Sequence, residues 1–240
     1  MKSLRRTRGA IGKVAEGREA VPDFVLEVEL GQDRGRTVIG IDEAGRGPWA
    51  GPVVAAAVWL DPGVRGPALA RRLDDSKKLT PAQRETLFAA LRDKASGCAV
   101  LGIGEADVAE IDTMNILQAS LLAMQRAAAA LTDALRSGDP QRSVDMALVD
   151  GNKLPRLACP AQAVVRGDGR SLSIAAASVV AKVTRDRTMA ALARDFPGYG
   201  WERNQGYGTA EHRQGIARLG VTPLHRRSFR PIREALSKAS

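Results

Sequence analysis

The sequence predicts an α/β domain in which helices flank a central mixed sheet. Short apolar segments rich in valine, isoleucine and alanine alternate along the chain with longer segments whose apolar residues recur at helical spacing. Such an alternation is typical of helices packed on the faces of one sheet. The chain has 240 residues, of which 44% are hydrophobic. This is enough for one large domain with its own core.

The apolar segments indicate five strands. They cover residues 36–44, 51–60, 97–106, 144–151 and 161–169. Pro48 and Pro52 bracket the connection between the first two strands. Neither residue can donate a backbone N–H to a strand ladder, so both mark positions where the ladder is interrupted. The last two strands are each expected to stop at a glycine, Gly151 and Gly169.

The helical segments begin and end at recognisable signals. They cover residues 80–96, 115–137, 171–196, 209–220 and 231–240. Thr80 followed by Pro81 matches an N-cap with proline in the first helical position. The second helix is expected to end at the SGDP sequence of residues 137–140.

The first 36 residues differ from the rest of the chain. They are rich in charge and glycine and show little periodicity, so we expect a basic, irregular and mobile extension. Residues 37–240 are expected to form the folded domain, including a helical C-terminal region.

The net charge favours a protein that binds nucleic acid, and the hydropathy and the cysteine content argue against membrane, secreted and zinc-binding proteins. The formal net charge is +9 and the pI about 10.1, which favours a polyanionic partner such as nucleic acid. No apolar run is long enough to span a membrane, and the N-terminus lacks the apolar region of a secretory signal. Two distant cysteines and two histidines form no zinc motif. We therefore expect a cytoplasmic protein with reduced thiols.

Carboxylates stand at the ends of three predicted strands. Asp42 and Glu43 end the first, while Asp150 and Asp168 each precede a glycine. A lone Asp-Gly pair is typical of an ordinary turn. Adjacent carboxylates at the end of an apolar strand, however, cost desolvation without a structural gain. If the strand ends converge, the four acids would repel one another unless hard cations such as Mg²⁺ or Mn²⁺ neutralise them.

Strand geometry limits this hypothesis, and other functions stay open. Neighbouring side chains on a strand point to opposite faces, so Asp42 and Glu43 reach one site only if the strand ends or bends there. Gly40 and Gly45 have the spacing of a phosphate-binding loop, but Arg46 and Gly47 replace its lysine and hydroxyl residue. A non-catalytic nucleic-acid binder and a metal-dependent phosphotransferase or nucleotidase are the alternatives.

Seven sequence blocks, in order, resemble ribonuclease HII, the prokaryotic type 2 ribonuclease H. They are IDEAGRGPWAGPVVAAAV, LDDSKKLT, NILQAS, LVDGNKLP, VRGDGRSLSIAAASVVAKVTRDR, NQGYGTAEH and TPLHRRSF. The similarity runs from about Val38 to Phe229. It implies a ribonuclease H-like fold, with a central mixed sheet flanked by helices and a helical C-terminal region, for the catalytic domain of residues 37–240.

The resemblance also implies an activity. The family cleaves the RNA strand of RNA–DNA hybrids and nicks duplex DNA 5′ to an embedded ribonucleotide, leaving 3′-hydroxyl and 5′-phosphate ends. We therefore expect a protein that acts on RNA–DNA hybrids and ribonucleotide-containing duplex DNA. Nothing in the sequence suggests an obligate oligomer, so we expect a monomer, with no membrane partner.

Site residues follow from the matched motifs. The resemblance makes Asp42, Glu43, Asp150 and Asp168 the catalytic ligands of Mg²⁺ or Mn²⁺. It makes the backbone of Gly45, Arg46 and Gly47 the reader of the 2′-hydroxyl, and it places Tyr207 against the neighbouring sugar. Lys77 or Lys78 is expected to contact phosphate, as is Arg46. For His225 two roles stay open, a general acid and a structural histidine.

Overall fold

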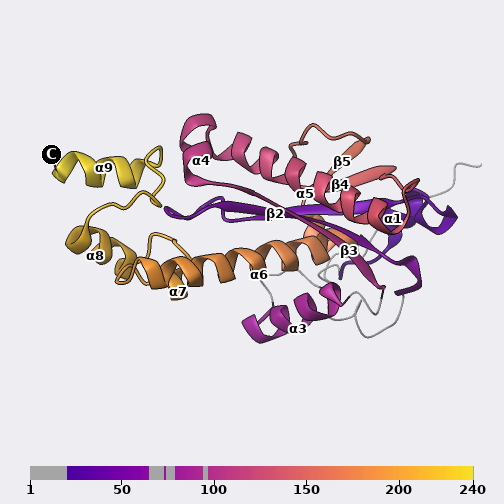
Figure 1. The fold of residues 1–240 in the computed structure, drawn as a ribbon, viewed down its shortest axis with the longest axis horizontal. Helices are drawn as coiled ribbons and strands as arrows, with labels where there is room; N and C mark the ends of the chain where they lie inside the picture. The colour runs from indigo at the N-terminus through magenta and orange to yellow at the C-terminus, as the bar shows by residue number, and fades with distance from the viewer. Residues whose placement is uncertain (1–20, 65–72, 74–78, 94–96, 240) are drawn as a thin grey trace, which may run out of the picture.

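A five-stranded mixed sheet with helices on both faces forms the centre of the computed structural model (Figure 1). The structure describes residues 21–64, 73, 79–93 and 97–239. The strands are β1 (Val38–Ala44), β2 (Val53–Leu60), β3 (Ala99–Ala106), β4 (Met146–Asp150) and β5 (Ala161–Val164). Their order is β3-β2-β1-β4-β5. β1, β2 and β3 are antiparallel neighbours, and β4 and β5 run parallel to β1. The predicted mixed sheet is confirmed.

Two long helices cover the two faces of the sheet. α5 (Ile116–Gly138) lies on one face and α6 (Leu172–Asp195) on the other (Figure 1). Strand β2 contributes side chains to the hydrophobic core on each face of the sheet, because alternate residues of a strand point to opposite faces. Val53, Ala55 and Ala57 belong to the core under α5. Ala56, Val58 and Leu60 belong to the core under α6.

The remaining predicted helices form near the expected positions. They are α3 (Pro81–Arg92), α8 (Ala210–Leu219) and α9 (Arg230–Ala239). Thr80 caps α3 with a reciprocal capping box to Gln83, and Thr209 caps α8 by accepting from the amide of His212. α3 ends at Arg92, before the expected end at about Ser96; residues 94–96 lie outside the described part of the chain.

Several short elements were not predicted. They are α1 (Val25–Glu29), α4 (Val108–Met114), α7 (Trp201–Asn204) and the single turns η1 (Gln32–Arg34), η2 (Pro62–Val64) and η3 (Gly167–Gly169). Each is too short to show a helical period. A local signal does mark α4, since Asp107 and Glu110 form a capping box at its start.

The irregular N-terminal extension expected for residues 1–36 is wrong for the part that the structure describes. Residues 21–36 contain α1 and η1, and they are fastened to the domain by polar side chains. Oε1 of the buried Glu27 accepts hydrogen bonds from the hydroxyls of Ser171 and Ser173, both at 2.6 Å, and from the amide of Ser173 at 2.9 Å. The side-chain amide of Gln32 donates to the Leu60 carbonyl at 2.6 Å. Apolar periodicity does not reveal anchors of this kind.

Glu27→Ala is therefore expected to destabilise the fold. The substitution leaves the hydroxyls of Ser171 and Ser173 buried without their acceptor, which costs roughly 1–3 kcal/mol. Urea denaturation would measure the loss. Glu29→Ala, on the exposed side of the same helix, is the matched control and should have little effect. Equal losses for the two variants would mean that the Glu27 contacts do not anchor the segment.

The C-terminal helices pack beside the connection between β1 and β2. The amide of Trp49 donates to the Gly206 carbonyl at 2.8 Å, the Gly51 amide to Leu224 at 2.9 Å, and the Arg226 amide back to Trp49 at 2.8 Å. A separate core around Trp201 joins α7, α8 and α9 to the end of α6. The predicted helical C-terminal region is thus fastened to the end of the sheet where β1 finishes (Figure 1).

Candidate active site

Asp42 and Asp150 are neighbours where the pairing between β1 and β4 stops. The parallel ladder ends with the pair Ile41 and Val149, so Asp42 and Asp150 are the next residues on each strand. Neighbouring strands are about 5 Å apart, which brings the two carboxylates close together. β1 itself continues beside β2 as far as Ala44.

Burial and repulsion act together on Asp42. Its side chain is 5% exposed. Burial raises its pKa well above the usual value, and the negative charges of Glu43 and Asp150 raise it further. Hydrogen bonds from the Ser178 hydroxyl and the Glu43 amide act in the opposite direction. Among the residues that the structure describes, no cationic partner offsets the burial of the Asp42 carboxylate.

Glu43 lies at the same site despite its position next to Asp42. Its pKa is also raised by burial, and the guanidinium of Arg46 partly offsets that effect. Nη1 of Arg46 lies 3.2 Å from Oε1 of Glu43. Both acids line one cavity. We expected β1 to end or bend here so that both acids could reach one site. Its pairing with β4 does stop before Asp42, but its pairing with β2 continues past Glu43.

Asp168 is not at the end of a strand, contrary to the sequence expectation. β5 ends at Val164, and Asp168 lies on η3. Arg166 adopts a left-handed conformation, with φ of 55°, and turns the chain out of the strand. The Gly167 amide then donates to Oδ1 of Asp150 at 2.7 Å, which holds this turn against the end of β4. Asp168 is buried and does not line the cavity that contains the other three acids.

The cavity combines acids with cations and a glycine turn. Its volume is about 260 Å³. The lining residues are Asp42, Glu43, Ala44, Gly45, Arg46, Gly47, Asp150, Ser178, Lys182, Arg185 and Tyr207. The side chain of Tyr207 is 47% exposed, and a Cβ added to Gly47 would lie 3.3 Å from its ring. The tyrosine therefore lies directly against the glycine turn.

Three residues of α6 complete the cavity and were not predicted. Ser178, Lys182 and Arg185 follow each other at a spacing of four and three residues, so they share one face of the helix. Nζ of Lys182 pairs with Asp186 at 2.7 Å. The helical spacing was visible in the sequence, but only the packing of α6 alongside β1 shows that this face meets the acids. Lys77 and Lys78, expected to contact phosphate, lie outside the described residues.

The donors fit a hard divalent cation, although the ligand shell is not preformed. Within the described ranges, no group of three or more His, Cys, Asp or Glu side chains is arranged to hold a metal ion. Asp42, Glu43 and Asp150 nevertheless supply carboxylate oxygens, the ligands that Mg²⁺ and Mn²⁺ prefer. Burial raises the pKa values of Asp42 and Glu43, and repulsion by the charge of Asp150 adds to that rise. A divalent cation would relieve this repulsion.

His225 lies in the core of the C-terminal region, away from the cavity. Its side chain is fully buried. The Thr222 amide donates to Nδ1 of His225 at 3.0 Å, so the ring proton is on Nε2. That proton is shared with Nε2 of His212 at 3.1 Å, which also accepts from the indole of Trp201 at 3.0 Å. Nδ1 of His212 then donates to the Tyr207 carbonyl at 3.0 Å. Of the two roles left open, the geometry supports the structural one.

The histidine pair is expected to make stability fall in acid. Burial lowers the pKa of His225 to about 4, and burial also lowers that of His212. Neutral rings are favoured in the fold, so stability is complete above the unfolded value of about 6.5 and declines as the pH falls toward 4. The loss due to His225 is on the order of 2 kcal/mol at pH 5. Urea denaturation of wild type and His225→Asn at pH 7 and pH 5 checks this. Identical pH slopes would contradict it.

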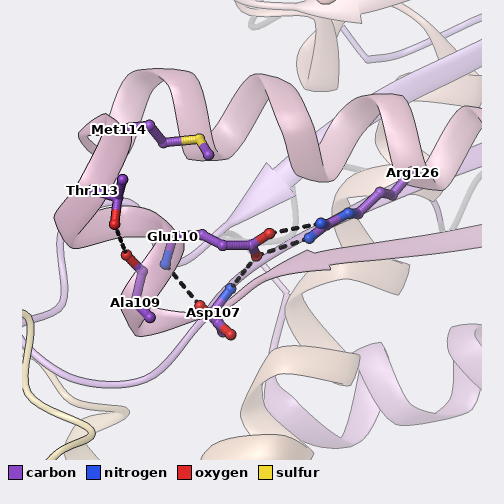
Figure 2. Close-up of a pocket in the computed structure, with 6 residues that line it drawn as sticks. All are labelled: Asp107, Ala109, Glu110, Thr113, Met114 and Arg126. Atoms are coloured by element: carbon purple, nitrogen blue, oxygen red, sulfur yellow. Dashed lines mark hydrogen bonds and ion pairs between the residues drawn. The ribbon is translucent and has the colours of Figure 1, made fainter.

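A second hollow lies between α4 and α5 and has no comparable chemistry (Figure 2). Its volume is about 420 Å³. Figure 2 shows Arg126 reaching both oxygens of Glu110, at 2.6 and 2.8 Å, while Asp107 caps α4 through the Glu110 amide. The Arg126 guanidinium and the Glu110 carboxylate are thus engaged with each other, and the candidate active site is the cavity at the end of β1.

No helix in the described part of the chain is long and apolar enough to cross a membrane.

A mixed sheet between two helical layers, with carboxylates at the ends of its two central parallel strands, is the arrangement expected of a ribonuclease H-type nuclease. The sequence profile of the ribonuclease HII family matches residues 39–232. The chain therefore belongs to the ribonuclease HII family. It is accordingly an endoribonuclease that acts on RNA–DNA hybrids, in a family whose members depend on divalent metal ions.

Individual relatives agree with this assignment. Ribonuclease HII of Rhodospirillum rubrum is 60% identical over 220 residues, which cover 92% of this chain and 94% of the relative. Ribonuclease HII of Paramagnetospirillum magneticum is 57% identical over 212 residues, covering 88% and 97%. Among solved structures, ribonuclease H2 of Pyrococcus horikoshii has a TM-score of 0.63 at 26% identity, covering 84% of this chain and 98% of that one. Bst ribonuclease HIII, solved with Mn²⁺, has a TM-score of 0.65 at 19% identity, covering 85% and 70%, and shows the shared fold.

Proposed function

We propose that the cavity at the end of β1 is where the chain hydrolyses the RNA strand of hybrids and nicks duplex DNA 5′ to a single embedded ribonucleotide. The products are a 3′-hydroxyl and a 5′-phosphate. The observation that carries this proposal is the composition of the cavity, which is lined by Asp42, Glu43 and Asp150 together with the Gly45–Gly47 turn. A phosphodiester and the adjacent ribose can therefore be held at one place.

The acids would hold Mg²⁺ or Mn²⁺. Asp42 is central, because it is repelled by both Glu43 and Asp150 and gains most from a cation. Asp168 belongs to the same group through its turn, which is fixed to Asp150 by the Gly167 amide. Such ions, when bound, activate the attacking water and stabilise the leaving oxygen of a phosphodiester. The chain itself contributes the arrangement of oxygens and the buried surroundings that strengthen their interaction with a cation.

Arg46 has two partners in this proposal. Without a cation it pairs with Glu43 at 3.2 Å, and its side chain is about half exposed. Once a cation neutralises Glu43, the guanidinium is free to contact a substrate phosphate, as guanidinium groups commonly do. Lys182 also lines the cavity and would provide a second phosphate contact.

The glycine turn and Tyr207 would distinguish RNA from DNA. A 2′-hydroxyl is the chemical difference between the two sugars. The amides of the turn are small donors on an exposed backbone, and Tyr207 offers a ring face and a hydroxyl beside Gly47. A ribose placed against this surface has partners that a deoxyribose cannot use.

The test is a cleavage assay on end-labelled duplexes. One duplex carries a single ribonucleotide, one is an RNA–DNA hybrid and one is DNA throughout, each with Mg²⁺, with Mn²⁺ or with chelator. The proposal predicts one metal-dependent nick 5′ to the ribonucleotide, cuts within the RNA of the hybrid and none in DNA. Cleavage 3′ to the ribonucleotide, or cleavage in chelator, would overturn it.

A further inference from the structure

Two buried arginines hold the glycine turn from inside the protein. Arg226 is fully buried. Its guanidinium donates to the carbonyls of Gly45 at 2.6 Å and Arg46 at 3.1 Å. It also donates to the carbonyls of Gly51 at 2.9 Å and Pro52 at 3.0 Å. One side chain thus ties both ends of the β1–β2 connection together.

Arg185 joins the same connection to the segment that carries Tyr207. It is 1% exposed. Its guanidinium donates to the carbonyls of Pro52 at 3.0 Å and Ala50 at 3.1 Å. Its Nη1 donates to the carbonyl of Gln205 at 3.0 Å, two residues before Tyr207. One guanidinium therefore ties the end of the β1–β2 connection to the segment that carries Tyr207, and the same side chain lies against Gly45.

The turn keeps its amide groups available. Gly45, Arg46 and Gly47 line the cavity, and the N–H groups of these three residues have no acceptor among the residues that the structure describes. The carbonyls of Gly45 and Arg46 are directed to buried Arg226. Because each peptide unit is planar, fixing a carbonyl also fixes the amide on its other side. Holding these two carbonyls therefore orients the amides of Arg46 and Gly47.

Hydrophobic packing alone does not explain why the charged side chains of Arg226 and Arg185 are buried. Neither guanidinium forms a salt bridge within the described residues. Burial lowers the pKa of Arg226 to about 9 and that of Arg185 to about 10, and the nearest acids, Asp112 and Asp186, only partly oppose this. Two cations buried side by side are costly unless their hydrogen bonds are well formed. Carbonyl groups supply those bonds here.

We propose that Arg226 and Arg185 are positioning residues for ribose recognition. Arg226 holds the carbonyls of Gly45 and Arg46 inward and so aims the amides of the glycine turn at the 2′-hydroxyl. Arg185 ties the end of the same connection to the segment that carries Tyr207. This inference rests on the proposed function and names the residues that maintain its specificity. Neither side chain needs to touch the substrate for this role.

The test measures ribose discrimination apart from affinity. Binding of wild type and Arg226→Gln to a duplex with one ribonucleotide, and to the same duplex in DNA throughout, is measured with Ca²⁺ in place of Mg²⁺. In Arg226→Gln the ratio of the affinities for the two duplexes should fall at least about tenfold. This is the change in affinity that the loss of one well-made hydrogen bond to the 2′-hydroxyl would cause. Affinity for the DNA duplex should be retained. A merely structural role predicts that both affinities fall together with the ratio unchanged, which would overturn the inference.

Two further variants keep the test decisive. Arg226→Lys retains the charge but cannot reach several carbonyls with one planar group, so it should lose discrimination while keeping the fold. Arg233→Gln, which removes an exposed arginine of α9, controls for the change in net charge and should behave as wild type. If wild type itself does not distinguish the two duplexes, the proposed function fails. If wild type does and both Arg226 variants keep its ratio, only the inference fails.

Discussion

Asp42→Asn is expected to abolish cleavage while making the metal-free protein more stable. The loss of activity should be about 10²-fold or more, the size seen when one preorganised electrostatic group is removed from an active site. The gain in stability has a separate cause. Burial and the charges of Glu43 and Asp150 raise the pKa of Asp42, so its ionised form is disfavoured in the fold. The penalty is absent below the unfolded value and grows as the pH rises through the folded value.

Thermal denaturation in chelator and in Mg²⁺ measures this effect. In chelator at pH 7, Asp42→Asn should melt above wild type, and the difference should shrink as the pH is lowered toward 4. Mg²⁺ should raise the melting temperature of wild type and have little effect on the variant, because a ligand stabilises only the state that binds it. A variant that cleaves normally, or that melts below wild type in chelator, would contradict this account of the site.

Gly45→Ala is expected to remove activity by displacing the buried arginine behind the turn. Gly45 has φ of 100°, a conformation that costs alanine roughly 1–2 kcal/mol. A Cβ here would lie 2.0 Å from Nε of Arg185 and 2.4 Å from its Cδ. The side chain cannot move without breaking its bonds to Ala50, Pro52 and Gln205. The turnover rate on the single-ribonucleotide duplex should therefore fall by more than the loss of folding stability can explain.

Gly35→Ala is the matched control for Gly45→Ala. Gly35 has a similar φ of 85°, but an added Cβ meets nothing within 4 Å. Gly35→Ala should therefore lose only the stability that alanine costs in this left-handed backbone conformation, and it should keep full activity. Steady-state rates and urea denaturation of both variants separate the two effects. Equal losses of activity would show that the contact with Arg185 is not what matters.

The sheet and the long helices were predictable because their signals are local. The apolar runs of β1 and β2 and the 23-residue α5 have unambiguous periods, and Thr80 and Pro81 mark the start of α3. Strand order and direction are set by contacts between distant segments, so they required the resemblance or the structure. The helical segment at residues 25–29 was missed because its anchor is one carboxylate, Glu27, whose partners are 144 and 146 residues away.

Three of the four acids could be placed from strand ends alone. Asp42, Glu43 and Asp150 line one cavity as that reasoning required. Asp168 could not be placed in the same way, because the left-handed turn at Arg166 ends β5 before it. The metal-ligand roles of all four remain predictions.

The supporting cations were harder to foresee. Lys182 and Arg185 look like ordinary helix charges in the sequence, and Arg226 looks like one residue of a basic cluster. Only the packing of α6 and the C-terminal segment against the β1–β2 connection reveals that Arg185 and Arg226 are buried and bonded to carbonyls.

The most direct test of the central claim is a crystal structure with a ribonucleotide-containing duplex and Mn²⁺, using anomalous scattering to locate the ions. We expect Mn²⁺ bound by Asp42, Glu43 and Asp150, with the 2′-hydroxyl within hydrogen-bonding distance of the amides of residues 45–47. Mn²⁺ bound instead in the hollow beside Asp107 and Glu110, or a ribose turned away from the glycine turn, would contradict the claim that metal binding and ribose recognition share one cavity.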